Sequence, residues 1–174
     1  MESAILLCVP EVEPLVHEWR LKGDPSAAHG VPAHVTLLYP FLPVDALDDG
    51  VIAELRWFFQ GIDAFRVSFT SVQRFEQAGV VWIAPESDAL VQLTRALVRR
   101  WPECPPYSGT IPIDELTPHL TIVQTDDRAL RQSAANAVSP GLPLEIVASS
   151  AALWVQDRDG AWAERTSFPF GPHE

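Results

Sequence analysis

The sequence predicts an α+β fold built mainly from antiparallel sheet. Stretches with helical apolar spacing are interleaved with strand-like stretches along all 174 residues. Several expected strands are joined by turns too short to hold a crossover helix, which favours antiparallel pairing over a doubly wound parallel sheet. No low-complexity segment or linker divides the chain, so we expect one domain spanning residues 1–174.

Strands and helices alternate in the first half of the chain. The expected elements are a strand over 4–10, a helix over 11–23, a loop over 24–32, a strand over 33–41 and a helix over 43–60. Both helices have apolar residues at helical spacing, and a glycine marks each end, Gly23 in the first and Gly61 in the second. In this half, the strand over 33–41 carries a histidine and is followed by a helix.

The second half repeats this alternation. The expected elements are strands over 64–76 and 79–86, a helix over 87–101, an irregular segment over 102–118, a strand over 119–124, a helix over 125–139, and closing strands over 142–156 and 160–170. The connection "QAG" suits a hairpin, and Ser87 or Asp88 can cap the helix that follows it. Proline and glycine make the segment over 102–118 irregular.

The net charge of −11 restricts the class of partner. Binding along an extended phosphate backbone needs lysines and arginines that displace counterions, so we expect no long duplex nucleic acid as partner. The longest apolar run near the N-terminus, residues 4–10, is too short for a secretory signal or a membrane span. Cys8 and Cys104 are isolated, which fits reduced thiols. We therefore expect a cytoplasmic protein that does not bind membranes.

Two short motifs place polar side chains within apolar strands. His34 and Thr36 occur in "AHVTLLYPF", and His119 and Thr121 occur in "PHLTIV", about half the chain later. Residues two apart in a strand face the same way. Each histidine therefore shares a face with its threonine, and because unpaired buried polar groups are costly, this face is expected to line a wet cleft. The other face, with Val35, Leu37, Tyr39 and Phe41 in the first motif and Leu120 and Ile122 in the second, is expected to be apolar.

Paired histidines suit acid–base chemistry on a phosphodiester. One neutral imidazole can accept a proton while a second, protonated imidazole donates one. Threonine hydroxyls can hydrogen-bond the non-bridging oxygens, where negative charge accumulates. The alternative, a zinc site, needs a third ligand, and neither motif has a nearby cysteine or a carboxylate on the same face. We therefore expect no metal and no cofactor.

The motifs "HVTLL" and "HLTIV" resemble the paired His-x-Thr motifs of the 2H phosphoesterase superfamily, and "VPAHVTLLYPF" is similar to its 2′-5′ RNA ligase-like and cyclic phosphodiesterase-like members. The resemblance implies a bilobal α+β fold with two pseudo-twofold related lobes around a central groove. It implies metal- and ATP-independent cleavage, or the reverse joining, of 2′,3′-cyclic or 2′,5′-linked phosphoesters. His34 and His119 would then be the catalytic pair, and Thr36 and Thr121 would hold the phosphate.

Two further residues are candidate substrate contacts. Tyr107, in the irregular segment "PPYSGT", can either stack on a base or close the end of the core. Arg74, at the end of a strand, can contact phosphate or face solvent. We expect a monomer acting on a small nucleotide or cyclic phosphate, or on short RNA ends. The alternatives are a 2′-5′ RNA ligase or other RNA-end processing enzyme, and a binding module that holds a nucleotide without turning it over.

Overall fold

The computed structural model describes residues 1–171 and confirms the α+β class, with two antiparallel four-stranded sheets and flanking helices. The first sheet has the strand order β2-β1-β7-β8 and the second has the order β5-β4-β3-β6. The strands are β1 (Ser3–Cys8), β2 (His34–Leu38), β3 (Phe65–Phe75), β4 (Val80–Glu86), β5 (Leu120–Gln124), β6 (Leu144–Ala148), β7 (Ser150–Gln156) and β8 (Trp162–Pro169). Adjacent strands pair antiparallel throughout.

The two motif strands are edge strands that meet in the middle of the molecule. β2 lies at one edge of the first sheet, β5 lies at one edge of the second, and the two strands contact each other. In the first sheet Thr36 pairs with Leu6, and in the second Thr121 pairs with Trp82. The sheets therefore bring the two His-x-Thr segments together although they are far apart in the sequence.

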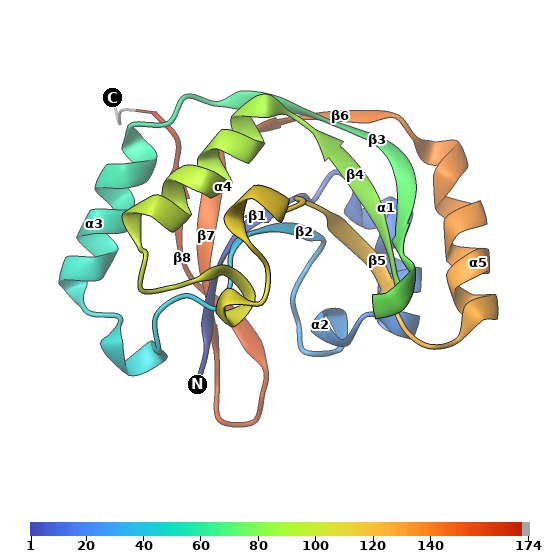
Figure 1. Ribbon diagram of the computed structural model, residues 1–174, viewed down its shortest axis with the longest axis horizontal. Helices are drawn as coiled ribbons and strands as arrows, with labels where there is room; N and C mark the ends of the chain where they lie inside the picture. Colours follow the sequence, from blue (N-terminus) through green and yellow to red (C-terminus); the bar gives the residue numbers. More distant parts are fainter. Residues whose placement is uncertain (172–174) are drawn as a thin grey trace.

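Helices cover the sheets and the flanks of the molecule. They are α1 (Glu13–Gly23), α2 (Pro25–Ala28), α3 (Asp49–Gln60), α4 (Asp88–Arg100) and α5 (Arg128–Val138). Figure 1 shows α3 and α5 on opposite flanks, with the strands between them. Side-chain caps fix the starts of four of these helices, with Asp24, Asp48, Ser87 and Asp127 each accepting from backbone N–H groups of the first turn. None of the helices in residues 1–171 is both long and apolar enough to span a bilayer.

The buried faces of the motif strands follow the expected alternation. Val35 and Leu37 of β2 and Leu120 and Ile122 of β5 are all buried in one continuous core. Tyr39 departs from the expectation because β2 ends at Leu38. Beyond that point the side chains no longer alternate, and Tyr39 turns toward the same cavity as Thr36 rather than into the core. The opposite faces of β2 and β5 are left free to form a site.

Three segments differ from the sequence expectation. The closing stretch over 142–156 is two strands, because the chain leaves the second sheet after β6 and enters the first sheet with β7. No glycine or proline marks this change, which falls at the two exposed serines Ser149 and Ser150. The helix expected over 43–60 starts only at Asp49, behind a separate 3-10 turn (Val44–Ala46). The loop expected over 24–32 contains the short helix α2.

Candidate active site

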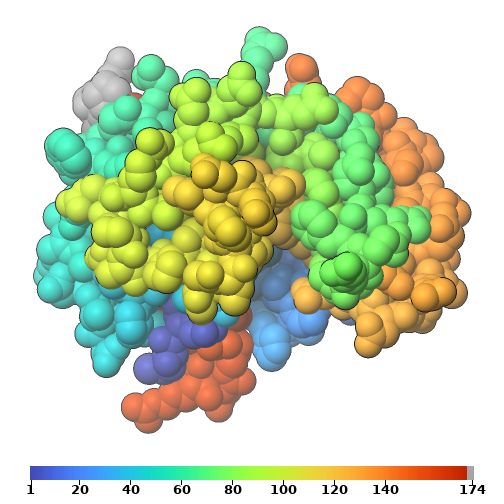
Figure 2. All heavy atoms as spheres, viewed as in Figure 1, coloured from blue at the N-terminus to red at the C-terminus, as the bar shows by residue number. Residues whose placement is uncertain are grey.

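The two motifs line one cavity of about 310 Å³ between the sheets. Its walls include His34 and Thr36 from the β2 edge of the first sheet and His119 and Thr121 from the β5 edge of the second. In Figure 2 the surface is hollowed between the yellow segment over 102–118 and the green turn that joins β3 to β4, with blue residues around α2 at the base. The strands therefore line a cavity, as expected from the alternation, and it contains all four motif residues.

Both imidazoles are held in the same way. Nδ1 of His34 lies 2.8 Å from the carbonyl oxygen of Pro32, and Nδ1 of His119 lies 2.8 Å from the carbonyl oxygen of Thr117. A carbonyl oxygen can only accept, so Nδ1 carries the proton and donates it in each case. Nε2 of each neutral ring is then free to accept a proton in the cavity. The same backbone contact, two residues upstream, fixes the tautomer in both halves.

The pKa values of both histidines are lowered. Burial is the main cause for His34, the positive charges of Arg20 and His119 add to it, and together they lower its pKa to about 4. The hydrogen bond to Pro32 and the carboxylate of Asp24 act in the opposite direction. Burial also lowers the pKa of His119, where the hydrogen bond to Thr117 opposes it. Both imidazoles are therefore neutral at pH 7 in the ligand-free protein.

A buried ion pair supports the wall beside His34. Arg20 of α1 is only 1% exposed, and its Nε and Nη2 atoms donate to Oδ2 of Asp24 at 3.0 and 2.9 Å. Oδ1 of Asp24 accepts from the backbone and the hydroxyl of Ser26, so this carboxylate also caps α2. Asp24 and Ser26 both line the cavity. The guanidinium is thus bound within the protein, and its partners form part of the cavity surface.

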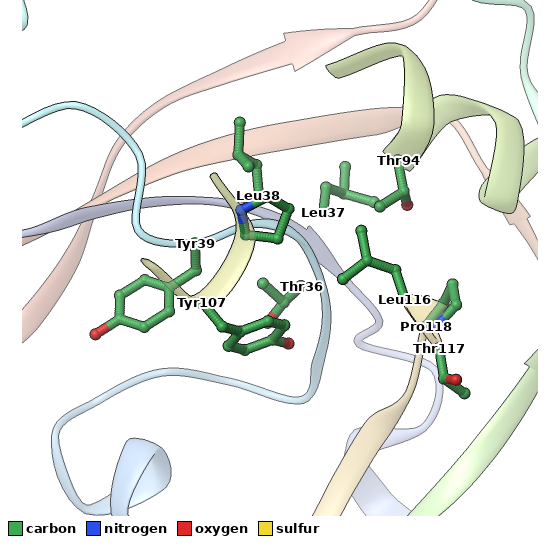
Figure 3. Close-up of a pocket in the computed structure, with 10 residues that line it drawn as sticks. Thr36, Leu37, Leu38, Tyr39, Thr94, Tyr107, Leu116, Thr117 and Pro118 are labelled. Carbon is green, nitrogen blue, oxygen red and sulfur yellow. The ribbon is translucent and has the colours of Figure 1, made fainter. Parts of the chain in front are cut away.

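Tyr107 reaches the cavity from a strained turn. Its φ is 49° and that of Ser108 is 56°, a left-handed conformation that costs residues other than glycine about 1 kcal/mol or more each. Its backbone N–H donates to the carbonyl oxygen of Tyr39 at 2.7 Å, which ties the turn to the end of β2. Burial raises the pKa of Tyr107, and a hydrogen bond with the side chain of Thr36 opposes this. Figure 3 shows its ring beside Thr36, and both residues line a narrow slot of about 20 Å³.

Aromatic side chains form one end of the cavity. Tyr39 packs edge-on against Tyr107, with ring centroids 6.5 Å apart, and against Trp162, with centroids 6.2 Å apart. All three line the cavity. Rings of this kind offer flat apolar surface and π faces on which a nucleobase can stack. Tyr107 therefore lies where its ring can contact a base in the cavity.

Arg74 lies outside this cavity. Its Nη2 donates to Oε1 of Gln132 on α5 at 2.8 Å, and its Nη1 lies 3.8 Å from a carboxylate oxygen of Glu76. The neighbouring residue Phe75 instead packs against His119, and alternation along β3 turns the two side chains to opposite faces of the sheet. Of the six residues singled out from the sequence, the other five meet at the cavity and Arg74 does not.

Several cavity residues were not foreseen from the sequence. Asp24, Ser26, Gln124 and Trp162 line the cavity, yet none belongs to a motif. The run "DPS" signals only a helix cap, and Gln124 lies at the end of β5 outside the His-x-Thr alternation. Within residues 1–171, no group of three or more histidine, cysteine, aspartate or glutamate side chains is arranged to hold a metal ion.

Comparison with known proteins identifies the family of the chain. The profile of the 2′-5′ RNA ligase superfamily matches residues 8–160, which is most of the chain. A search of curated proteins gives no significant match.

Solved structures share the fold across nearly the full chain. A structure of Escherichia coli LigT complexed with 3′-AMP has a TM-score of 0.66 at 18% identity, covering 98% of both chains. The protein TT0787 of Thermus thermophilus has a TM-score of 0.66 at 20% identity, covering 99% of this chain and 100% of its own. LigT complexed with ATP has a TM-score of 0.63 at 17% identity, covering 98% of both chains. At these identities the likeness establishes the fold.

Proposed function

Because the chain belongs to the 2′-5′ RNA ligase superfamily, we propose that it is a phosphoesterase that opens the cyclic phosphodiester of a 2′,3′-cyclic nucleotide, free or at a short RNA end. The observation that carries this proposal is the convergence of both His-x-Thr pairs on one cavity, with each imidazole held through Nδ1. Acid–base catalysis on a phosphodiester requires two such groups at one site, a neutral imidazole to accept a proton and a protonated one to donate it.

The reaction adds water across one P–O bond. A neutral imidazole accepts a proton from the attacking water through Nε2, and the water oxygen forms a bond to phosphorus. The P–O bond to one ribose oxygen breaks, and the protonated imidazole donates its Nε2 proton to that oxygen. The hydroxyls of Thr36 and Thr121 hydrogen-bond the non-bridging oxygens while negative charge accumulates there. The product is a phosphomonoester, and the two histidines have exchanged protonation states.

The electrostatic surroundings assign the two roles for hydrolysis. Burial, with the added charge of Arg20, lowers the pKa of His34 to about 4 even though the carboxylate of Asp24 opposes this, whereas burial alone lowers the pKa of His119. A neighbouring positive charge favours the neutral form of an imidazole. We therefore assign His34 as the base and His119 as the acid, and the roles are exchanged in the reverse, joining direction.

The size of the cavity and the net charge of the protein favour a small substrate. A volume of about 310 Å³ lies at the lower end of the range of small-molecule sites. The net charge of −11 disfavours the approach of long polyanions. The related LigT structures hold 3′-AMP and ATP, which are ligands of nucleotide size. The aromatic wall that includes Tyr107 is the proposed contact for the base.

The proposal is tested with adenosine 2′,3′-cyclic phosphate in the presence of EDTA. We expect ring opening to a single phosphomonoester isomer, followed by ³¹P NMR, because the scheme uses no metal ion. Full loss of turnover with EDTA would exclude the scheme. Binding without turnover would identify a nucleotide-binding module, and joining of RNA ends in preference to hydrolysis would identify a ligase. His17→Gln serves as a control because this histidine is exposed on α1 and lies outside the cavity.

A further inference from the structure

The central cavity continues into a second hollow of about 290 Å³. The two share Asp24, Pro25 and Gln124 as lining residues, so they adjoin one another, and together they are called the groove below. The slot beside Tyr107 shares Thr36, Tyr39 and Tyr107 with the central cavity but no residue with the second hollow. The groove therefore runs from an aromatic end, past the two histidines, to a polar end at the junction of α1, α2 and β5.

Positive charge is distributed unevenly along this groove. Among the residues that the structure describes, no lysine or arginine side chain lines the central cavity. The nearest guanidinium, that of Arg20, is buried and bonded to Asp24. Lys22, the only lysine in the chain, is exposed and lines the second hollow. Within the described part of the chain, the first cation along the groove without a carboxylate partner is therefore in the second hollow.

The second hollow also offers hydrogen-bond donors. The hydroxyl oxygen of Thr125 accepts from the backbone N–H of Asp127 at 3.2 Å, which leaves the hydroxyl hydrogen available to an oxygen of a ligand. The side-chain amide of Gln124 lies between the two hollows. Nζ of Lys22 lies 4.8 Å from the centroid of the Trp19 ring, a cation–π contact that restricts the lysine and lowers the entropic cost of using it.

We infer that the second hollow binds a second phosphate group of the substrate, attached at the 5′ oxygen of the nucleotide whose cyclic phosphate lies between the histidines. This inference rests on the proposed function. In a ribose 2′,3′-cyclic phosphate, the phosphate occupies one edge of the sugar ring. The base and the 5′ oxygen extend from the two sides of that edge, away from each other. With the base against the aromatic end, the 5′ oxygen is directed to the other end, where Lys22 and Thr125 lie. Substrates are then 5′-phosphorylated cyclic nucleotides or the last nucleotide of a short RNA.

The test compares adenosine 2′,3′-cyclic phosphate with its 5′-phosphorylated form. We expect kcat/KM to be about three- to fivefold higher for the 5′-phosphorylated substrate at low salt, the effect of one partly exposed ion pair. The preference should decrease at high salt because screening weakens exposed pairs. Lys22→Gln should abolish the preference and leave turnover of the simple substrate unchanged, and Lys22→Arg should retain it. Arg128→Gln, which removes an exposed cation outside the groove, should have no effect.

The outcomes separate this inference from the proposed function. Turnover of the simple substrate without a preference, or a preference that survives Lys22→Gln, overturns the inference and leaves the proposed function intact. Calorimetry tests the inference independently of turnover, with adenosine 3′,5′-bisphosphate and 3′-AMP as probes. Tighter binding of the bisphosphate than of 3′-AMP by the wild-type protein, lost in Lys22→Gln, supports a phosphate site in the second hollow. Equal affinity of the wild-type protein and Lys22→Gln for the bisphosphate refutes it.

Discussion

The two His-x-Thr halves of the cavity have the same backbone geometry and different surroundings. In both, Nδ1 of the histidine donates to a carbonyl two residues upstream at 2.8 Å, and the threonine follows two residues later on an edge strand. His34 lies near the buried Arg20–Asp24 pair. His119 instead packs edge-on against Phe75 and Trp82, with ring centroids 5.2 and 5.8 Å away. The halves thus repeat a geometry while their electrostatics differ.

This difference shows how a near-symmetric pair can perform asymmetric chemistry. A base must start neutral and an acid must start protonated, so two histidines in identical surroundings would have no preferred assignment. Burial and the charge of Arg20 provide that preference at His34, where they outweigh the carboxylate of Asp24, and at His119 burial acts without a neighbouring positive charge. The following predictions test the comparison, beginning with the largest expected effect.

Removing either imidazole should have the largest effect. We expect His34→Ala and His119→Ala each to lower kcat/KM by about 10²- to 10⁴-fold, the usual contribution of a positioned acid or base. The double variant should be little worse than either single variant, because the two groups act as a unit. Steady-state kinetics on a 2′,3′-cyclic nucleotide measures this. Activity that persists in both single variants would break the paired scheme.

Breaking the buried Arg20–Asp24 ion pair beside His34 should lower the stability of the protein. Arg20→Met leaves the carboxylate of Asp24 buried without its partner, at a cost of about 3–5 kcal/mol in the free energy of unfolding. Urea denaturation measures this cost. The matched control is Arg131→Gln, whose partner Glu76 lies 3.8 Å away and is exposed, and it should change stability by less than about 1 kcal/mol. Equal costs would show that the Arg20 pair has no special structural role.

Removing a threonine hydroxyl should slow the chemical step. Thr36→Val and Thr121→Val keep the side-chain shape and remove one donor to the phosphate oxygens, and we expect kcat to fall by about 10²-fold in each. Tyr107→Phe should lower kcat only severalfold, since it removes the hydrogen bond to Thr36 and leaves the threonine hydroxyl in place. Single-turnover measurements separate these effects from product release. A change in KM alone would indicate that the hydroxyls contribute to binding rather than to the chemical step.

The pH dependence should reveal the lowered histidine pKa values. Both are shifted below 6.5 in the free protein, so the protonated acid is depleted as pH rises through neutrality and kcat/KM should decline there. The optimum of kcat should lie at higher pH, because the negative charge of a bound phosphate raises the pKa of both imidazoles. Full pH profiles of both constants measure the difference. An optimum of kcat/KM above about pH 7.5 would contradict the lowered pKa values.

Local sequence patterns predicted most of the elements and the faces of the motif strands. Alternation placed Val35 and Ile122 in the core and both His-x-Thr pairs on the opposite faces. The sequence offered Ser87 or Asp88 as the cap of α4, and the structure has Ser87. These features depend on residues within a few positions of one another, where backbone periodicity and helix capping act. Where alternation stopped, at the end of β2, the expectation for Tyr39 was wrong.

What the sequence alone determined is therefore the strand and helix pattern and the residues able to perform acid–base chemistry. Only the tertiary structure decided that the edges β2 and β5 meet, that Arg20 is buried against Asp24 beside one histidine, and that Arg74 lies away from the groove. Likewise, only the fold joins Gln124 to the start of α2 and so continues the groove toward Lys22. The physical reason is that these features arise from contacts between distant segments, which no local periodicity encodes.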